Sequence, residues 1–242
     1  MTIQQTISPI NDVVYVERPL ATLQQIDATL TQAVAAQQQW KHASLSVRGD
    51  ICKKMIEVML VDVDAAAEEL TWQMGRPIRY TPFELTGGFQ ERAQHMISIA
   101  ADALQHVATP PKEGFQRFIQ REPVGVVLVL PPWNYPYLTA VNSIVPAIMA
   151  GNAVVIKHSS QTPLVAERFV KAFLEAGLPE GVCQFVHATH DDVAKMIQDA
   201  RVDFVAFTGS VAGGHAVQRA AGDRFIATGM ELGGKDPAYI RV

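Results

Sequence analysis

An asparagine between prolines follows the most apolar segment of this chain. Residues 124–130 are all apolar apart from one glycine, and the sequence PPWNYP follows them at 131–136. A run without polar alternation predicts a strand buried on both faces, and the prolines stiffen the turn after it. Asn134 is therefore expected at the carboxyl end of a central strand, where open parallel sheets bind ligands. The same residue could instead simply cap the next helix.

Two further predicted strand ends carry polar residues and glycines. Lys157 precedes His158, two serines and a threonine at one helix start, and Gly209-Ser210 leads straight into another helix. The free amides and positive dipole end of a helix suit a phosphate group. Each loop alone could be purely structural, because such residues commonly cap helices. Three of these loops on one sheet edge predict a nucleotide site.

A glycine-rich segment, GMELGGKD at 229–236, matches a P-loop up to its last position. A P-loop needs Ser or Thr there to hold Mg²⁺, and a helix must follow. Asp236 would instead repel phosphate, and AYIRV at 238–242 predicts another strand. We therefore interpret Glu231 as a carboxylate that a glycine-rich bend directs into the cleft.

Other chemical motifs are missing from the sequence. It contains no GxGxxG fingerprint, no GxSxG elbow and no HExxH pair. His187 and His190 are three residues apart across a predicted strand end, and we expect no cluster of further ligands around them, so no metal site is expected. Cys52 and Cys183 are too far apart to indicate a disulfide framework, and Cys52 is interpreted as a core residue.

A strict alternation of predicted strands and helices places these strand ends at one edge of a sheet. Strands are predicted at 124–130, 153–157, 182–187, 202–207 and 225–230, with helices at 138–150, 163–176, 191–200 and 211–221 between them. Alternation of this kind implies right-handed crossovers and a parallel sheet. The expected fold class is α/β, with a five-stranded parallel sheet and helices on both of its faces.

Three more helices are predicted ahead of the sheet, and we expect them to cover its flank. The first begins at a capping box formed by Thr22 and Gln25. The second carries apolar residues over 51–70 and ends at Gly75. The third begins near residue 81, with Glu84 at the capping-box position.

Two extended segments flank these helices. A short strand is predicted at 13–16. The polar segment within 109–123 could be a sheet edge or an arm that reaches a partner.

Composition excludes several classes of protein. The chain has 242 residues, a net charge of −4, 48% hydrophobic and 18% charged residues, and no basic block, so a nucleic-acid partner is not expected. No apolar run is long enough to span a membrane, and the first residues lack the features of a secretory signal. We expect a cytoplasmic protein.

The motifs together resemble the aldehyde dehydrogenase superfamily. PWNYP (132–136), the segment 157–163, FTGS (207–210) and ELGGK (231–235) occur in the family's order and spacing, as does LTWQMGRP (70–77). The resemblance covers essentially the whole chain and implies a nicotinamide dinucleotide-binding domain over 1–242 with a variant Rossmann sheet. It also implies that 109–123 is a bridging and oligomerisation arm.

The resemblance implies specific roles. Asn134 would hold the substrate oxyanion with its side-chain amide, and Glu231 would be the general base that activates hydrolytic water. Lys157 and Ser160 would lie at the adenosine ribose, Ser210 at the pyrophosphate, and Trp133 along the cofactor cleft. The remaining cofactor-binding residues would be Leu130, Pro131, Gly209, Leu232 and Gly233.

Two departures from the family pattern matter. Ser160 stands where a ribose-binding Glu is common, so NADP is expected to bind at least as well as NAD. The family's catalytic Cys lies a few dozen residues after ELGGK, but this sequence ends at residue 242, so we expect the catalytic domain to be absent from this chain. Neither Cys52 nor Cys183 aligns with it.

The expected function is therefore one half of an NAD(P)-dependent aldehyde oxidation, with a small aldehyde as substrate and no activity of this half alone. We also expect a homo-oligomer or a complementary chain. The alternative is a non-catalytic remnant that binds nucleotide or serves assembly.

Overall fold

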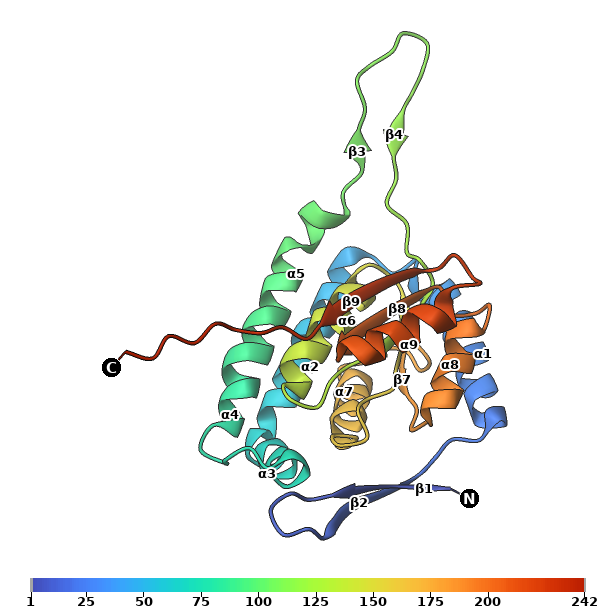
Figure 1. Cartoon of the computed structure of the whole chain (residues 1–242). Helices are drawn as coiled ribbons and strands as arrows, with labels where there is room; N and C mark the ends of the chain where they lie inside the picture. Colours follow the sequence, from blue (N-terminus) through green and yellow to red (C-terminus); the bar gives the residue numbers. More distant parts are fainter. Residues whose placement is uncertain (1, 242) are drawn as a thin grey trace.

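A five-stranded parallel sheet forms the centre of the computed structural model, which describes residues 2–241 (Figure 1). Its strands are β5 (Val126–Leu130), β6 (Ala153–Ile156), β7 (Cys183–Phe185), β8 (Phe204–Gly209) and β9 (Ala227–Leu232). Their spatial order is β7-β6-β5-β8-β9, so the first strand is central and the chain winds outward from it in both directions. The predicted α/β fold and all five strands are confirmed.

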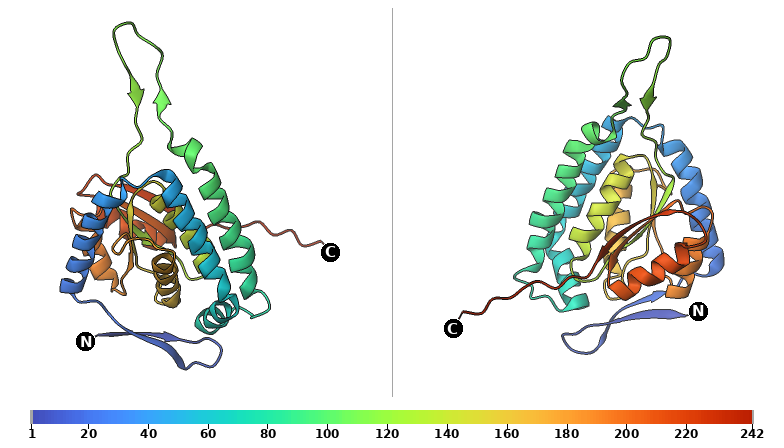
Figure 2. Two further views of the ribbon diagram at one scale, coloured as in Figure 1. Left: turned by 180° about the vertical axis from the view of Figure 1, so that it is seen from behind. Right: turned by 45° about the horizontal axis from the view of Figure 1, so that its top comes forward.

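Helices cover both faces of this sheet, as the side-chain alternation along β5 requires. Val127 and Val129 pack into the core beneath α2 (Leu45–Val61), α5 (Gln90–Leu104), α6 (Pro136–Met149) and α7 (Leu164–Glu175). Val126, Leu128 and Leu130 pack on the other face against α1 (Leu23–Trp40), α8 (His190–Gln198) and α9 (Val211–Ala221). Figure 2 shows α1 and α5 on opposite sides of the molecule.

The central strand begins at Val126, where the backbone meets the loop before β8. Gly125 has φ of 127°, and a Cβ atom there would lie 2.0 Å from Oδ2 of Asp203. The same carboxylate oxygen accepts a hydrogen bond from the Val126 amide at 2.8 Å. Glycine is required at this position both for its backbone angle and for the space.

The amino-terminal helices differ in detail from the prediction. The capping box of Thr22 and Gln25 begins α1 as expected. The second predicted helix is two helices, because Asp62 leaves helical geometry (φ −120°, ψ 42°) between α2 and α3 (Val63–Met74). The predicted helix end at Gly75 is confirmed, and Gly75 adopts a left-handed conformation with φ of 79°.

The third predicted helix contains a π-helical segment. A short helix α4 (Thr81–Phe83) leads into η1 (Glu84–Phe89) and then α5. Gly88 lies against α6, because a Cβ atom at Gly88 would be 2.6 Å from Cδ1 of Leu138. Wider helical turns of this kind are often found at functional sites.

Two antiparallel ribbons extend from this body (Figure 1). The first pairs β1 (Ile3–Ile7) with β2 (Val14–Pro19). Only β2 overlaps the predicted strand; β1 was not predicted, because two adjacent glutamines interrupt its apolar residues. The second ribbon is the projecting arm, in which β3 (Val107–Ala108) pairs with β4 (Phe118–Ile119).

Residues 233–241 form an exposed extended segment that leaves the body (Figure 1). The strand predicted from AYIRV is wrong over 238–241, where the backbone pairs with no described strand; Val242 lies outside the described residues. No helix follows β9 within residues 233–241, so the P-loop alternative lacks the helix it needs. None of the helices in the described part of the chain is long and apolar enough to cross a membrane.

Candidate functional site

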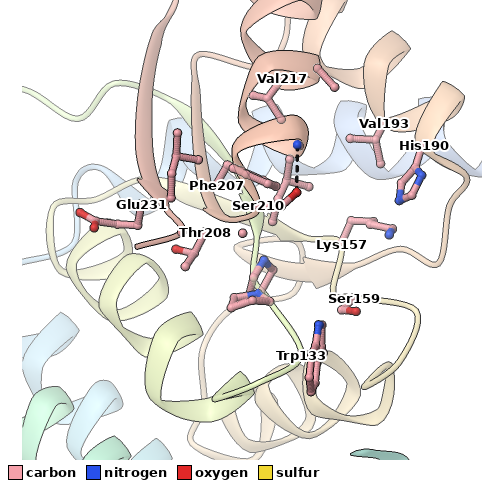
Figure 3. Close-up of a pocket in the computed structure, with 18 of the residues that line it drawn as sticks. Trp133, Lys157, Ser159, His190, Val193, Phe207, Thr208, Ser210, Val217 and Glu231 are labelled. Carbon is pink, nitrogen blue, oxygen red and sulfur yellow. Dashed lines mark hydrogen bonds between the residues drawn. The ribbon is translucent and has the colours of Figure 1, made fainter. Parts of the chain in front are cut away.

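A cleft of about 780 Å³ lies at the carboxyl ends of β5, β6, β8 and β9 (Figure 3). It opens where the winding direction of the sheet reverses, between β5 and β8, which is the usual ligand position in open α/β sheets. All but one of the predicted site residues line it: Leu130, Pro131, Trp133, Asn134, Lys157, Gly209, Ser210, Glu231, Leu232 and Gly233. The predicted strand ends thus meet at one edge.

Ser210 begins helix α9 at the floor of the cleft. Its hydroxyl oxygen accepts a hydrogen bond from the Gly213 amide at 3.1 Å (Figure 3). A side chain does not fit at either Gly209 or Gly213, since a Cβ atom there would lie 2.6 Å from the Phe207 ring. The positive end of α9 lies at the cleft, an arrangement that suits an anionic group.

Lys157 supplies a cation to the cleft that no carboxylate among the described residues pairs with. The residue is only 7% exposed, and within residues 2–241 its ammonium group has neither a hydrogen bond nor an ion pair. Burial lowers its pKa, because the low-dielectric surroundings disfavour the charged form. Figure 3 shows Lys157 beside His190 and near Ser159 on the side of the cleft opposite Glu231. An amine that lines the cleft without a partner in the described residues is a ready ligand for hydroxyl or phosphate oxygens.

Ser160 is the predicted site residue that the structure places outside the cleft lining. Its side chain is exposed, and its carbonyl oxygen accepts a hydrogen bond from the Thr6 hydroxyl at 2.7 Å. Its neighbour Ser159 lines the cleft instead.

The helix after PPWNYP is capped by a residue from far earlier in the chain. Glu84 Oε1 accepts from the amides of Tyr137 at 2.8 Å and Leu138 at 3.1 Å. Asn134 does not cap this helix; its Oδ1 accepts only from the adjacent Tyr135 amide, at 3.1 Å. The capping alternative for Asn134 is therefore wrong, and so is the capping-box role expected of Glu84 in its own helix. The Asn134 Nδ2 group remains available to donate into the cleft.

Glu231 lies on β9 opposite Thr208 of β8 and is exposed. It lines the main cleft and also a second cleft of about 730 Å³ between the sheet and α6. Figure 3 shows its carboxylate on the side of the main cleft away from Lys157 and His190. A carboxylate at this opening can accept a proton from water.

Several cleft residues were not predicted. His190, the first residue of α8, was considered only as a metal ligand, yet it lines the cleft. Val193, Ile197 and Val217 form an apolar wall between α8 and α9. The apolar stripes of the two helices were visible in the sequence, but that they face each other depends on the tertiary packing.

Neither cysteine reaches the cleft. Cys52 is fully buried in α2, and Cys183 is 3% exposed in β7, in the core on the α2 and α7 side. Burial raises the pKa of the Cys52 thiol to about 12 and raises that of Cys183 further, so both are neutral thiols near pH 7. Among residues 2–241 no group of three or more His, Cys, Asp or Glu side chains could hold a metal ion.

A family model and several known proteins match this chain. The model of the family described as "Aldehyde dehydrogenase family" matches residues 2–241. A 3,6-anhydro-alpha-L-galactose dehydrogenase of Streptomyces coelicolor is 31% identical over 237 residues, 97% of this chain and 47% of that protein. Succinate semialdehyde dehydrogenase [NAD(P)+] Sad of Escherichia coli is 29% identical over 92% of this chain and 48% of its own length.

A solved structure of succinic semialdehyde dehydrogenase from Streptococcus pyogenes with NADP+ superposes with a TM-score of 0.90 at 29% identity. The match covers 96% of this chain and 51% of that one. The chain thus spans about half the length of the curated relatives it matches.

Proposed function

Because this chain belongs to the aldehyde dehydrogenase family, we propose that it is the dinucleotide-binding half of an enzyme that oxidises an aldehyde to a carboxylic acid. The hydride acceptor is NAD or NADP. One observation supports this proposal above the others: Asn134 and Glu231 line the same cleft as Lys157 and Ser210. Groups for binding an anionic cofactor and groups for carbonyl chemistry thus share one space.

The cleft residues fit a dinucleotide along its length. The helix end at Ser210 lines the cleft and suits the pyrophosphate. Lys157 suits a ribose, and the apolar wall of α8 and α9 suits the adenine ring. Trp133, which is 51% exposed, forms part of the opposite wall. When bound, the cofactor supplies the hydride acceptor.

The chain's own residues do two things in this chemistry. Asn134 Nδ2 donates to the aldehyde oxygen as negative charge develops there, while a cysteine thiolate adds to the carbonyl carbon. After hydride loss leaves a thioester, Glu231 takes a proton from the water that attacks it, and the acid and the thiol are released. Neither Cys52 nor Cys183 can supply that thiolate, since both are buried away from the cleft. We therefore expect residues 1–242 by themselves to bind cofactor without oxidising aldehydes.

Titration of NADH and NADPH into the purified chain, followed by tryptophan fluorescence and calorimetry, tests the binding step. Saturable binding that Lys157→Met weakens at least tenfold is expected. Absence of binding would contradict the proposal and favour an assembly role. Aldehyde-dependent cofactor reduction that Cys52→Ser or Cys183→Ser abolishes would contradict the placement of the nucleophile outside these residues.

NADP is the cofactor we propose to bind at least as well as NAD. Ser160 brings no negative charge next to the loop that carries Lys157 and Ser159. A carboxylate 4 Å from a 2′-phosphate would cost about 4 kcal/mol at an effective dielectric of 20, and less at an exposed position. Ser160→Glu should therefore shift the affinity ratio toward NAD, whereas Ser98→Glu, the same change on exposed α5, should not. NAD binding tenfold tighter than NADP, with the ratio unmoved by Ser160→Glu, would contradict this choice.

The projecting arm supports assembly with further copies of the chain. Phe115, Phe118 and Ile119 on it are each more than half exposed, and β4 pairs only with β3 among the described strands. Open strand edges with apolar side chains recruit other strands. Light scattering should show a dimer or larger species, and a stable monomer at high micromolar concentration would contradict it. We place the protein in the cytoplasm, in keeping with its two free thiols.

A further inference from the structure

We propose that Arg76 and Glu84 are positioning residues that fix the backbone around Asn134 and direct its side-chain amide into the cleft. This inference rests on the proposed function, in which the Asn134 amide donates to the substrate oxygen. The contacts themselves come from η1 and from the segment that connects α3 to α4, outside the five-stranded sheet. We call Arg76 and Glu84 together the loop clamp.

Glu84 holds one end of the loop by capping α6. The residue is 4% exposed and lies in the π-helical segment η1. Its Oε1 accepts hydrogen bonds from both the Tyr137 and Leu138 amides. Tyr135, at the N-cap position of α6, makes no side-chain capping hydrogen bond. An uncapped helix end would leave these amides without partners, and the positive end of α6 favours the carboxylate. Gly88, one turn further on, gives α6 the space to approach Glu84.

Arg76 holds the other end. One guanidinium nitrogen pairs with Oε2 of Glu84, and another donates to the carbonyl oxygen of Asn134. The guanidinium also lies over the Tyr135 ring, 4.5 Å from its centroid. Because its planar fork makes these three contacts at once, a lysine amine could not replace it.

The consequence for Asn134 is that its acceptor atoms are occupied. The carbonyl oxygen binds Arg76, and Oδ1 binds the Tyr135 amide. In the described part of the chain Nδ2 has no partner, and Asn134 lines the cleft. A side chain held in this way costs no reorganisation when charge develops on the substrate oxygen. The contacts therefore do more than join two helices: they determine which atom of Asn134 faces the reaction.

Amide exchange measured by NMR tests each contact separately. The Tyr135 amide reports on Asn134, and the Tyr137 and Leu138 amides report on Glu84. Arg76→Ala should speed exchange at Tyr135 and move both Asn134 Nδ2 proton signals toward the shifts of an unstructured asparagine, while Tyr137 and Leu138 stay protected by Glu84. Glu84→Gln keeps an acceptor for the two amides but weakens the pairing with Arg76. It should reproduce the change at Asn134 with only a small loss of protection at Tyr137.

Two further variants control for general damage. The amide exchange rates of Arg76→Lys should lie between those of Arg76→Ala and those of the wild type. Arg79→Ala removes an arginine of the same connecting segment that stacks on Tyr80, and it should change nothing at Asn134. If Glu84→Ala does not fold, the proposal is decided by Arg76→Ala and Glu84→Gln. Unchanged Asn134 and Tyr135 signals in Arg76→Ala would overturn the proposal.

The cofactor titration separates this proposal from the proposed function. Arg76→Ala should leave the NADH and NADPH dissociation constants within about twofold of wild type, because Lys157 and Ser210 do not contact the clamp. Altered exchange in a chain that binds no cofactor would leave the clamp standing and contradict the function. Normal cofactor binding together with a loop unaffected by Arg76→Ala would support the proposed function and contradict the loop clamp. A tenfold loss of NADH affinity in Arg76→Ala would show a general disruption of the cleft and overturn a positioning role.

Discussion

The Nδ1 atom of His158 lies 3.1 Å from the hydroxyl oxygen of Thr162, and both side chains are buried. The other ring nitrogen, Nε2, is buried without a hydrogen-bond partner in the described residues. Burial lowers the pKa of His158 from about 6.5 to about 3, so the folded protein holds the ring neutral.

This histidine makes stability depend on pH. Between pH 6.5 and 3 the unfolded chain binds a proton that the folded chain does not, so falling pH favours unfolding. The loss should be about 2 kcal/mol at pH 5 and should be missing in His158→Asn, measured by denaturant unfolding from pH 7.5 to 5. His215→Asn, at an exposed position, should keep the wild-type slope.

Two carboxyl groups bear on the same measurement. Burial raises the pKa of Glu84 against the opposing effects of the Leu138 amide and Arg76, which gives a dependence of opposite sign. Burial of Glu167 would also raise its pKa, but hydrogen bonds from His187 and Arg18 lower it to about 2, and its effect begins only below pH 4.5. Both carboxyl groups are common to wild type and His158→Asn and cancel in the difference. Equal slopes in the two proteins would contradict the neutral ring.

Lys157→Met should stabilise the protein without ligand while weakening cofactor binding. The change removes a buried charge that has no partner in the described residues, and the free energy of unfolding should rise by about 1 kcal/mol. Loss of a charged hydrogen-bond donor should weaken cofactor binding at least tenfold. Thermal unfolding with and without NADPH measures both effects. Lys171→Met, at an exposed position on α7, should show neither; a destabilised Lys157→Met protein would refute the unpaired charge.

Ser210→Ala and Ser44→Ala remove the same kind of helix cap from two different helices. Ser210 accepts the Gly213 amide at 3.1 Å, and Ser44 accepts the Val47 amide at 3.3 Å at the start of α2. Each substitution should cost about 1 kcal/mol of stability. Only Ser210→Ala should weaken NADH binding, which calorimetry will show. Equal NADH affinities in the two variants would mean that Ser210 serves the helix alone.

The glycine pair of η1 should respond unequally to alanine. A Cβ atom at Gly88 would meet Leu138 at 2.6 Å, inside the packing between η1 and α6. At Gly87 it would meet the outer edge of the Phe83 ring, a side chain that is 74% exposed and free to turn. We expect Gly88→Ala to destabilise the protein by about 1–3 kcal/mol and Gly87→Ala to be nearly neutral. Urea unfolding decides, and the reverse order would contradict the described packing.

Both thiols should be unreactive in the folded protein. Cys52 and Cys183 are buried, and their raised pKa values keep the nucleophilic thiolate scarce at pH 7.5. Reaction with a disulfide reagent should be at least about 100-fold slower than in denaturant, where two thiols react. One rapidly reacting thiol in the native protein would reopen the question of an internal nucleophile.

The sheet and its ligand edge were predictable because their signals are local. The valine-rich run of β5 and the capping residues Thr22 and Ser210 determine their own elements within a few positions. The end of α3 at Gly75 needed only one residue able to adopt a positive φ.

What failed depended on partners far away in the chain. Asn134 was open to a capping role because nothing near it in sequence shows that Glu84 takes that role from 50 or so positions earlier. Ser159 rather than Ser160 lines the cleft, and the Ser160 carbonyl instead binds Thr6 of the ribbon strand β1, which was not predicted. The AYIRV segment has a strand's composition, but composition does not supply the neighbouring strand that a strand requires.

The central position of β5 also affects how the chain folds as it is synthesised. The strand β6, made soon afterwards, pairs with one side of β5, and β7 then pairs with β6, while the other side of β5 waits for β8. At ribosomal rates of about 5–20 residues per second, the stretch from Leu130 to Gly209 takes on the order of ten seconds. Throughout that interval a valine-rich strand edge is exposed on the nascent chain, a target for chaperones and for the same strand on neighbouring nascent chains.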